Sequence, residues 1–290
     1  MFFQQLVNGI TIGSLYSLVA LGLTMVYGIM RVLDIANAGA YTLGAYLGVV
    51  TYMSTRSIVL ALLAGIVGTA LTGYLLQLLV YTPLKRLGDP IIPLVASIGL
   101  FTVIQDLIRL IAGPYTRSFP VHLPFDRFVV GHVVITGTQL IILITAAVLF
   151  TLLWFILDKT KIGLAWQATA QDAETAMAMG INTNSVMAFA FMLGYILSAV
   201  SGILVGIHHN AVFPSMGNIP SYKMLAIVVL GGLGSPIGAV AASMLIGLCE
   251  AFVTGYIGSA IPTDAIAFLA LLIVLLVRPQ GLFGIGGVSR

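Results

Sequence analysis

A succession of long apolar runs limits the possible folds of this chain more than any motif does. A helix needs about 20 predominantly apolar residues to cross the hydrocarbon core of a membrane. Runs of about that length occur at roughly 5–29, 35–53, 58–80, 91–112, 137–157, 185–207, 222–253 and 262–277. Of the 290 residues, 60% are hydrophobic and only 7% charged, against about 25% charged in a typical soluble domain. The sequence therefore predicts an all-α, polytopic membrane protein of about eight transmembrane segments, with residues 1–290 as a single transmembrane domain.

Charge and cysteine content argue against several other classes. Lys and Arg number 12 and Asp and Glu 9, a small surplus without a basic cluster, so we expect membrane lipid and not nucleic acid around the chain. The single cysteine, Cys249, gives neither a disulfide framework nor a cysteine metal site. His208 and His209 would point about 100° apart on a helix, and His122 and His132 share a loop without another ligand type. We therefore predict no metal site.

Small residues recur at helical spacing in two of the apolar runs. Such rows allow the backbones of neighbouring membrane helices to approach closely. The rows are Gly9, Gly13, Ser17 and Gly22 in the first run, and Ser198, Gly202 and Gly206 in the sixth. We expect these residues to serve packing.

The start of the second run, DIANAGAYTLGAYLG from Asp34, is too polar for a helix that faces lipid. Polar groups at membrane depth must be satisfied inside the protein or by a water-filled cavity. We therefore predict a broken helix that lines a solute path, with Asp34, Asn37, Gly39 and Tyr41 along it. The alternative is a plain interfacial loop in which Asp34 caps the following helix.

The seventh run is longer than one span needs and is interrupted by GGLGSPIG at 231–238, which includes Gly232. No Lys-Ser/Thr follows these glycines, so the run is not a phosphate-binding loop. We predict a half-helix, a break near mid-membrane, and a second helix, echoing a Gly-rich break at 38–48. The similar tetrapeptides LGAY at 43–46 and IGAV at 237–240 hint at repetition, and interrupted segments in both halves of a chain are typical of inverted repeats.

Few polar side chains fall within the apolar runs. Asp106 and Arg109 stand at i and i+3, one turn apart on a helix face, and Gln105 precedes them. They either form a structural pair or contribute to a polar pathway. Glu250 lies in an apolar context, where a carboxylate must pair with another polar group or lie near an interface.

The distribution of Lys and Arg predicts the orientation. Short loops on the cytoplasmic side carry the excess of basic residues. We assign Lys85 and Arg86, residues 158–161 and Arg278 to that side, which places the N-terminus outside and requires the 222–253 unit to be re-entrant or to cross twice. Arg117 and Arg127 in the long connection 113–136 run against this rule.

The segment 158–183 is the longest without strong apolar character. Alanine, methionine and glutamine favour a helix over 164–179, and Gly180 suits the position just past its end. An interfacial anchor would carry a Lys/Arg face opposite a Trp/Leu/Phe face, and this segment has neither. Its small side chains instead suggest a socket for a protein partner.

The segment also resembles the cytoplasmic coupling loop of the branched-chain amino-acid ABC transporter permeases of the LivH type. The resemblance rests on Gly163, Ala165, Ala168, Ala170, Asp172, Ala176 and Gly180-Ile181-Asn182. It continues through GSLYSLVALGLTMVYGI at 13–29, SIGL at 97–100, VLGGLGSPIGA at 229–239, Glu250 and LLVRPQGLFG at 275–284. Matching blocks in one order carry more weight than a single motif.

This resemblance implies a non-catalytic permease subunit in a bacterial inner membrane. It implies a second, homologous or identical permease, two ATP-binding-cassette ATPase subunits that use ATP and Mg, and a periplasmic solute-binding protein. The chain itself would hold no cofactor. The coupling residues would be Gly163, Ala165, Gln167, Ala168, Asp172, Ala176, Gly180 and Asn182, and the solute path would include Asp34, Asn37, Gly39, Tyr41, Gln105, Asp106, Gly232 and Glu250.

Two positions depart from the family pattern. The family has an Asn-Phe-Ala-His-Gly-Glu run where this chain has residues 34–39, and Gln167 stands where an arginine is frequent. The first difference leaves the solute open and the second changes the charge of the docking helix. The alternative function is a self-sufficient channel or ion-coupled carrier, which would use Asp106 and Glu250 as ion or proton sites.

Overall fold

A computed structural model describes residues 1–85, 87–89, 91–121, 127–130, 133–258, 262–278 and 281–283. Arg86, His122, His132, Pro279 and Gln280 lie outside these ranges. The helices are α1 (Phe2–Met30), α2 (Asn37–Thr55), α3 (Ile58–Leu76), the π-helical η1 (Gln77–Tyr81), α4 (Thr82–Lys85), α5 (Ile91–Ala112), α6 (Gly137–Lys159), α7 (Lys161–Gln171), α8 (Ala173–Ala178), α9 (Thr183–His209), α10 (Asn218–Gly231), α11 (Pro236–Tyr256) and α12 (Thr263–Val277). A small antiparallel hairpin, β1 (Arg127–Val130) and β2 (Val133–Thr136), precedes α6.

Six of the described helices are long and apolar enough to cross a membrane: α1, α3 with its continuation to Lys85, α5, α6, α9 and α11. The shorter apolar α10 is packed among them, so the expected all-α, multi-pass membrane fold is confirmed. Helix ends fall where the sequence supplies caps. Thr136 and Gln139, for example, form a reciprocal capping box at the start of α6.

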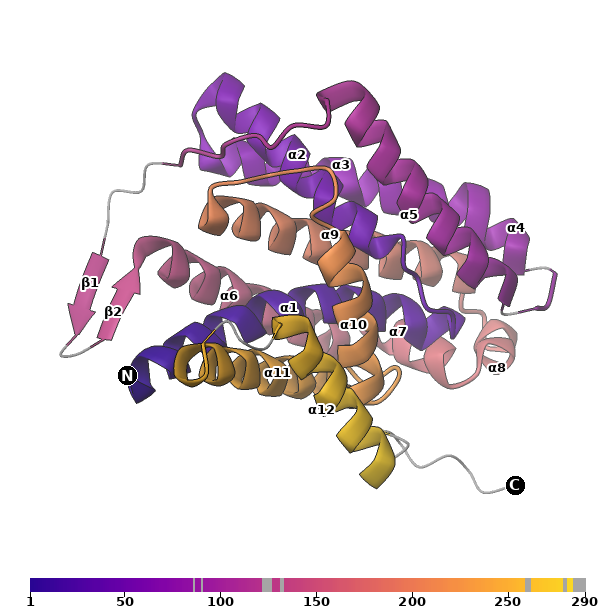
Figure 1. Ribbon diagram of the computed structural model, residues 1–290. Helices are drawn as coiled ribbons and strands as arrows, with labels where there is room; N and C mark the ends of the chain where they lie inside the picture. Colours follow the sequence, from indigo (N-terminus) through magenta and orange to yellow (C-terminus); the bar gives the residue numbers. More distant parts are fainter. Residues whose placement is uncertain are drawn as a thin grey trace.

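The predicted basic markers that the structure describes lie at one end of the bundle, called the inner end below. Lys85 reaches Met187 near the start of α9, and Lys159 ends α6 just before α7. The segment after Arg278 returns to α10, where the Leu282 amide donates to the Leu230 carbonyl over 2.8 Å. The N-terminus and the β1–β2 hairpin lie at the opposite, outer end (Figure 1).

Both rows of small residues mediate close helix contacts, as expected. A Cβ atom on Gly13 would lie 3.0 Å from the Met244 backbone in α11. Gly22 in α1 and Gly194 in α9 meet backbone to backbone, and a Cβ on Gly202 would lie 2.0 Å from the Tyr41 carbonyl oxygen in α2. These contacts bring α1 close to α9 and α11, and α9 close to α2.

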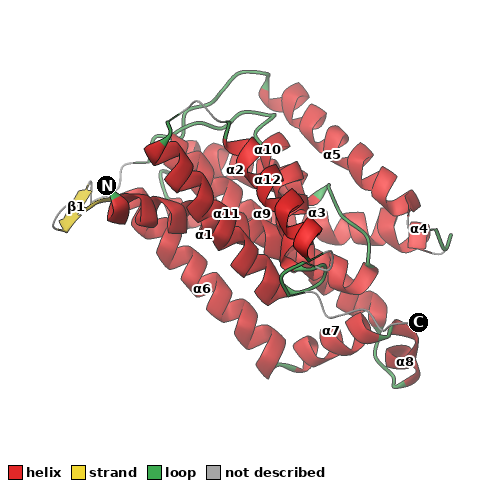
Figure 2. Ribbon diagram, turned by 60° about the horizontal axis from the view of Figure 1, so that its bottom comes forward, coloured by secondary structure: helices red, strands yellow, loops and turns green. Residues whose placement is uncertain are grey.

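The helix contacts follow an inverted repeat. In the first half, α3 packs on α9 and α2, and α5 packs on α2. In the second half, α11 packs on α1 and α10, and α12 packs on α10. Exchanging α1, α2, α3 and α5 for α9, α10, α11 and α12 thus reproduces these contacts, and α1 and α9 run in opposite directions (Figure 1). Helices α5 and α6 lie on opposite sides of the bundle (Figure 2).

One interruption lies close to where the sequence predicted it, and the others do not. The chain leaves the helix at residues 31–36, which include the start of DIANAGAY and in which Val32, Asp34 and Ala36 are buried, whereas residues 38–48 are continuous helix. The GGLGSPIG turn is not near mid-membrane, because Gly234 lies beside Tyr27 and Gly28 close to the inner end of α1. The LGAY and IGAV tetrapeptides belong to α2 and α11, which are not counterparts in the two halves.

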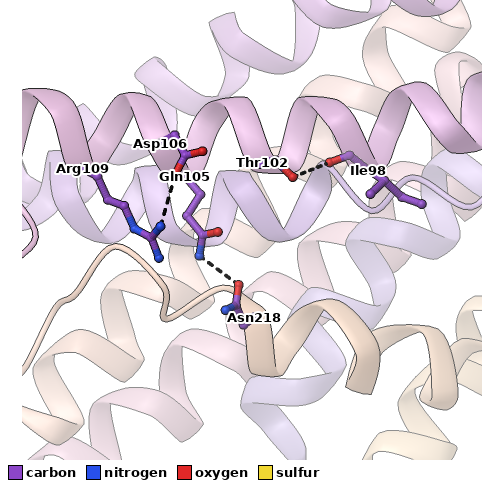
Figure 3. Close-up of polar contacts among 6 residues, drawn as sticks. All are labelled: Ile98, Thr102, Gln105, Asp106, Arg109 and Asn218. Carbon is purple, nitrogen blue, oxygen red and sulfur yellow. Dashed lines mark hydrogen bonds and ion pairs between the residues drawn. The ribbon is translucent and has the colours of Figure 1, made fainter.

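The starts of α2 and α10 lie within the bundle, unlike the GGLGSPIG turn. Gln105 lies about 20 Å along α5. Its side-chain amide donates to the side-chain oxygen Oδ1 of Asn218, at the start of α10, over 2.9 Å (Figure 3). A Cβ on neighbouring Gly217 would lie 2.6 Å from the Ala38 carbonyl oxygen in α2. The N-termini of two corresponding helices therefore meet inside the bundle, because the polar residues that break them are satisfied there.

Candidate functional site

A cavity of about 540 Å³ lies between α1, α9, α10 and α11. Its outer part is lined by His208, His209 and Phe213, and its deeper walls are mainly aliphatic. On the inner side α1 and α9 close together at Gly22 and Gly194. The cavity is therefore associated with the outer half of the bundle.

Three polar side chains line this cavity from three different helices, two of them buried and Tyr16 half-buried. Lys223 in α10 and Glu250 in α11 form an ion pair with Nζ and Oε1 2.9 Å apart, and both side chains are only 3% exposed. The Tyr16 hydroxyl in α1 donates to the second oxygen of Glu250 and accepts from Lys223, each over 2.8 Å. Glu250 thus pairs with a polar partner, the first of the two alternatives the sequence left open.

A second, more polar cavity of about 350 Å³ adjoins the first. Thr11, Ile12, His208 and Glu250 line both cavities. The amide of Gln139 donates to Asn8 over 2.9 Å in the wall of the second cavity. Because these residues lie near the outer ends of α1 and α6, the second cavity forms a polar approach to Glu250.

Asp34 is fully buried in the segment between α1 and α2. Its two carboxylate oxygens accept hydrogen bonds from the hydroxyls of Tyr81, over 2.5 Å, and Tyr195, over 3.0 Å. The Ala36 amide donates to it over 3.0 Å. This burial rejects the alternative of a plain interfacial loop. The carboxylate does not line the cavity and instead ties η1 and α9 to the segment before α2.

Replacing Asp34 with alanine is expected to destabilise the chain. Tyr81 and Tyr195 would lose their shared acceptor, and a buried polar group left unsatisfied costs about 1–3 kcal/mol. Asp106→Ala is the control, because its exposed carboxylate contributes less than about 1 kcal/mol. Thermal unfolding of the purified proteins in detergent compares the two, and an equal, small effect of both changes would contradict the structural role of Asp34.

The other expected pathway residues are spread through the bundle. Tyr41 joins Glu250 in lining the large cavity. The Asn37 amide lies within 3.3 Å of the Gly194 oxygen and 3.1 Å of the Leu23 nitrogen, where it bridges α2, α9 and α1. Gly39 packs against Ile104.

Asp106, Gln105 and Gly232 also lie outside the cavity. Asp106 pairs with Arg109 over 3.2 Å on the exposed face of α5, whereas Gln105 points toward α10 (Figure 3). The exposed fractions of the Asp106 and Arg109 side chains are 59% and 48%. Gly232 lies in the turn at the inner end of α10 with a φ of 104°. Among the predicted path residues, only Tyr41 and Glu250 therefore line the same cavity.

The segment 158–183 forms two short helices at the inner end, not the single helix expected over 164–179. Asp172 ends α7 in an extended conformation and caps α8, accepting from the Glu174 and Thr175 amides over 2.9 and 3.3 Å. Hydrogen bonds from the Thr175 side chain and from these two amides hold the pKa of Asp172 below its ordinary value. An aspartate favours an N-cap over continuation of a helix, which explains the break.

The remaining coupling residues have distinct environments. Gly163 is buried, and a Cβ there would lie 2.3 Å from the Ile156 and Leu157 carbonyl oxygens, so the α6–α7 corner requires glycine. Gly180 has a φ of 86°, in keeping with its predicted place past a helix end. Gln167 is exposed and donates to the Leu157 carbonyl oxygen over 2.9 Å.

The alanines of the two helices differ in burial. Ala165 and Ala168 of α7 are half-buried, whereas Ala176 of α8 is buried. Asn182 caps α9 by accepting from the Ser185 amide over 3.3 Å. The outward surface is formed instead by Ile162, Leu164, Met177 and Met179, with Leu164 63% and Met179 80% exposed.

Sequence reasoning missed Lys223, Tyr16 and Trp166. A lysine within an apolar run is a signal comparable to Glu250, and their opposite charges suggest a pair. Trp166 is buried in α7, where its indole nitrogen donates to the Met25 carbonyl oxygen in α1 over 3.1 Å and its ring packs on Gly28. Nothing in the sequence around Trp166 indicates that partner.

Comparison with known proteins assigns the family. The family model described as branched-chain amino acid transport system / permease component matches residues 5–277. The chain is 36% identical to the high-affinity branched-chain amino acid transport system permease protein BraD of Pseudomonas aeruginosa, over 98% of this chain and 96% of that protein. It is 32% identical to LivH of Escherichia coli, over the same shares of the two chains. No solved structure matches the chain.

These similarities extend across both inverted halves, the cavity and the coupling segment. The structure is in keeping with this similarity, because it is a multi-pass bundle of apolar helices. The chain belongs to the family of branched-chain amino acid transport system permease components.

Proposed function

We propose that this chain is the membrane-spanning subunit of an ATP-binding-cassette importer in a bacterial inner membrane. The observation that carries the proposal is the similarity over 98% of the chain to permease proteins named for high-affinity branched-chain amino acid transport. The solute is a branched-chain or related amino acid. A cavity of about 540 Å³ with a polar spot and aliphatic walls supports a small amphiphilic solute of this kind.

The importer includes other subunits. A second permease, homologous or identical, completes the membrane part, and a periplasmic solute-binding protein delivers the solute at the outer end. Two ATPase subunits bind ATP and Mg at the inner end. This chain binds no cofactor and is not itself an enzyme.

The ATPase contact is the inner surface of α7 and α8. Gln167, Ala168, Asp172 and Gly180 lie on or beside this surface, and exposed Leu164 and Met179 supply apolar contact area. Exposed apolar side chains rimmed by polar ones favour a protein interface. Gly163, Ala165 and Ala176 pack on the buried side of α7 and α8, and Asn182 begins α9 directly after them.

Trp166 connects the α7–α8 surface to α1, so a movement of that surface can be transmitted to the cavity. It joins α7 to Met25 and Gly28 near the inner end of α1. Leu15, Tyr16 and Val19 of the same helix line the cavity. A shift of α7 caused by the ATPases would therefore act directly on a wall of the solute path.

Reconstitution tests the proposal. Proteoliposomes containing this chain with its permease and ATPase partners should import labelled leucine, isoleucine or valine when the binding protein is outside and ATP is inside. Import should cease without ATP. Uptake by this chain alone, driven by an ion gradient, would instead favour the channel or carrier alternative.

Introducing a charged side chain on the α7–α8 surface tests whether this surface contacts the ATPases. Leu164→Glu should lower import by about tenfold, the change expected from a loss of about 1.4 kcal/mol, because a carboxylate would be buried in the ATPase contact. Val134→Glu is the control, since Val134 is also exposed but lies in the outer hairpin. Co-purification of the ATPases and import are measured for both variants. Normal co-purification and import by Leu164→Glu would place the contact elsewhere.

A further inference from the structure

The Lys223–Glu250–Tyr16 cluster is a closed ring of hydrogen bonds on the cavity wall. Lys223 donates to Glu250 and to the Tyr16 hydroxyl over 2.9 and 2.8 Å, and that hydroxyl donates to the other oxygen of Glu250 over 2.8 Å. The ammonium nitrogen also lies 4.9 Å from the centre of the Tyr16 ring. Among the residues that the structure describes, one cation and one anion are thus held side by side.

Stability alone is a weak reason for such a pair. Removing two charges from water costs more than their attraction commonly returns, and apolar residues of similar volume are frequently as stable or more stable. The pair is not a tie buried in solid packing, because both of its members line the cavity. Charged side chains inside membrane helices typically mark a solute or ion pathway.

The rest of the deep cavity wall is mainly apolar, with Tyr41 and Ser201 as polar exceptions. Leu15, Val19, Met224 and Ile227 surround the polar cluster, with Met216 and Ile219 nearby. An aliphatic amino acid has the matching pattern, with an ammonium and a carboxylate on one carbon and an apolar side chain. Its two charges need counter-charges whenever it leaves water.

We infer that Lys223 and Glu250 recognise the zwitterionic head group of the solute by exchanging partners with it. The solute ammonium pairs with Glu250, and its carboxylate pairs with Lys223 and the Tyr16 hydroxyl. Within the described cluster, two ion pairs with the solute then replace the pair between Lys223 and Glu250, and a zwitterion adds no net charge. When the cavity is empty, the side chains neutralise each other. This inference rests on the proposed amino-acid importer function.

The adjoining polar cavity supplies the direction of approach. Glu250 lines both cavities, and Gln5, Asn8 and Gln139 line the second one toward the outer end. A solute that enters there meets the carboxylate first and can keep polar contacts while it loses water. Its apolar side chain then faces the aliphatic walls around Met224.

The test removes both charges together. Single changes leave a buried charge without its counter-ion and risk misfolding, so the variant is the double change Lys223→Met/Glu250→Gln, which keeps an oxygen for the Tyr16 hydroxyl. The control is Asp106→Asn/Arg109→Gln, which removes the exposed ion pair on α5. The reconstituted complex is assayed for import of labelled leucine, for ATP hydrolysis and for thermal unfolding.

We expect the Lys223→Met/Glu250→Gln complex to unfold no earlier than the wild type and to hydrolyse ATP, but to import leucine about a hundredfold more slowly, as is typical for loss of buried charge-pair contacts. The control should import within about twofold of the wild type, as expected for an exposed ion pair. Import at the wild-type rate by the Lys223→Met/Glu250→Gln complex overturns the inference. So does loss of import that accompanies unfolding or loss of assembly, because the pair is then structural. If the wild-type complex imports no amino acid, the proposed function itself fails.

Discussion

Alanine in place of Gly202 is expected to destabilise this protein more than alanine at any glycine on the lipid-facing side. Its Cβ would lie 2.0 Å from the Tyr41 carbonyl oxygen and 2.8 Å from the Tyr41 carbonyl carbon. Both atoms are backbone, so no side chain can move aside, and α2 and α9 must separate. Overpacking of this kind costs about 1–3 kcal/mol, and more where the backbone resists.

Gly99→Ala is the matched control for this change. Gly99 lies in α5, and no atom would come within 4 Å of an added Cβ. Alanine also favours a helix over glycine by about 1 kcal/mol. Thermal unfolding in detergent should therefore shift down for Gly202→Ala and stay level or rise for Gly99→Ala. Equal shifts for the two variants would show that α2 and α9 are not packed backbone to backbone.

Replacing Trp166 with alanine is expected to uncouple ATP hydrolysis from import. The change removes the hydrogen bond to the Met25 carbonyl and the ring that packs on Gly28. Truncating a buried aromatic residue costs about 3–5 kcal/mol where the site does not collapse. The α7 surface for the ATPases would remain, so hydrolysis should persist, while import should fall by about tenfold or more if even 1.4 kcal/mol of coupling is lost.

Trp166→Phe separates the two contacts. It retains an aromatic ring but removes the indole donor, for which a net loss of about 0.5–1.5 kcal/mol is typical. Import should be intermediate between the wild type and Trp166→Ala. Import and ATP hydrolysis are measured on the same proteoliposomes. Parallel loss of both activities in Trp166→Ala would mean that the tryptophan supports assembly and not transmission.

Helix positions were well predicted because membrane helices carry a strong local signal. The run expected at 91–112 is α5 with the same bounds, and that at 137–157 is α6 to within two residues. Small-residue rows also gave the helix faces that touch. The breaks were less predictable. The polar start of DIANAGAY at Asp34 indicated the interruption found at residues 31–36, but the glycines at 38–48 gave a false signal, because they lie in continuous helix and serve close packing.

The site was partly predictable. Glu250 was recognised because a carboxylate within an apolar run needs a partner, but Lys223 lies 27 residues away on another helix. Asp106 and Arg109 gave the stronger local pattern, yet they pair on an exposed face. Only packing distinguishes a pair that lines a cavity from one that covers a surface.

The segment 158–183 shows both contributions. Composition alone determined that it lies outside the apolar helices, and the glycine at 180 determined where its second helix ends, because a φ of 86° suits glycine. The tertiary structure decided that Asp172 divides it into α7 and α8, and that Trp166 fastens it to α1. Apolar length and backbone preference are properties of neighbouring residues and can be read along the chain. The ring of Tyr16, Lys223 and Glu250 and the contact of Trp166 with Met25 join residues from distant helices, so folding alone brings them together.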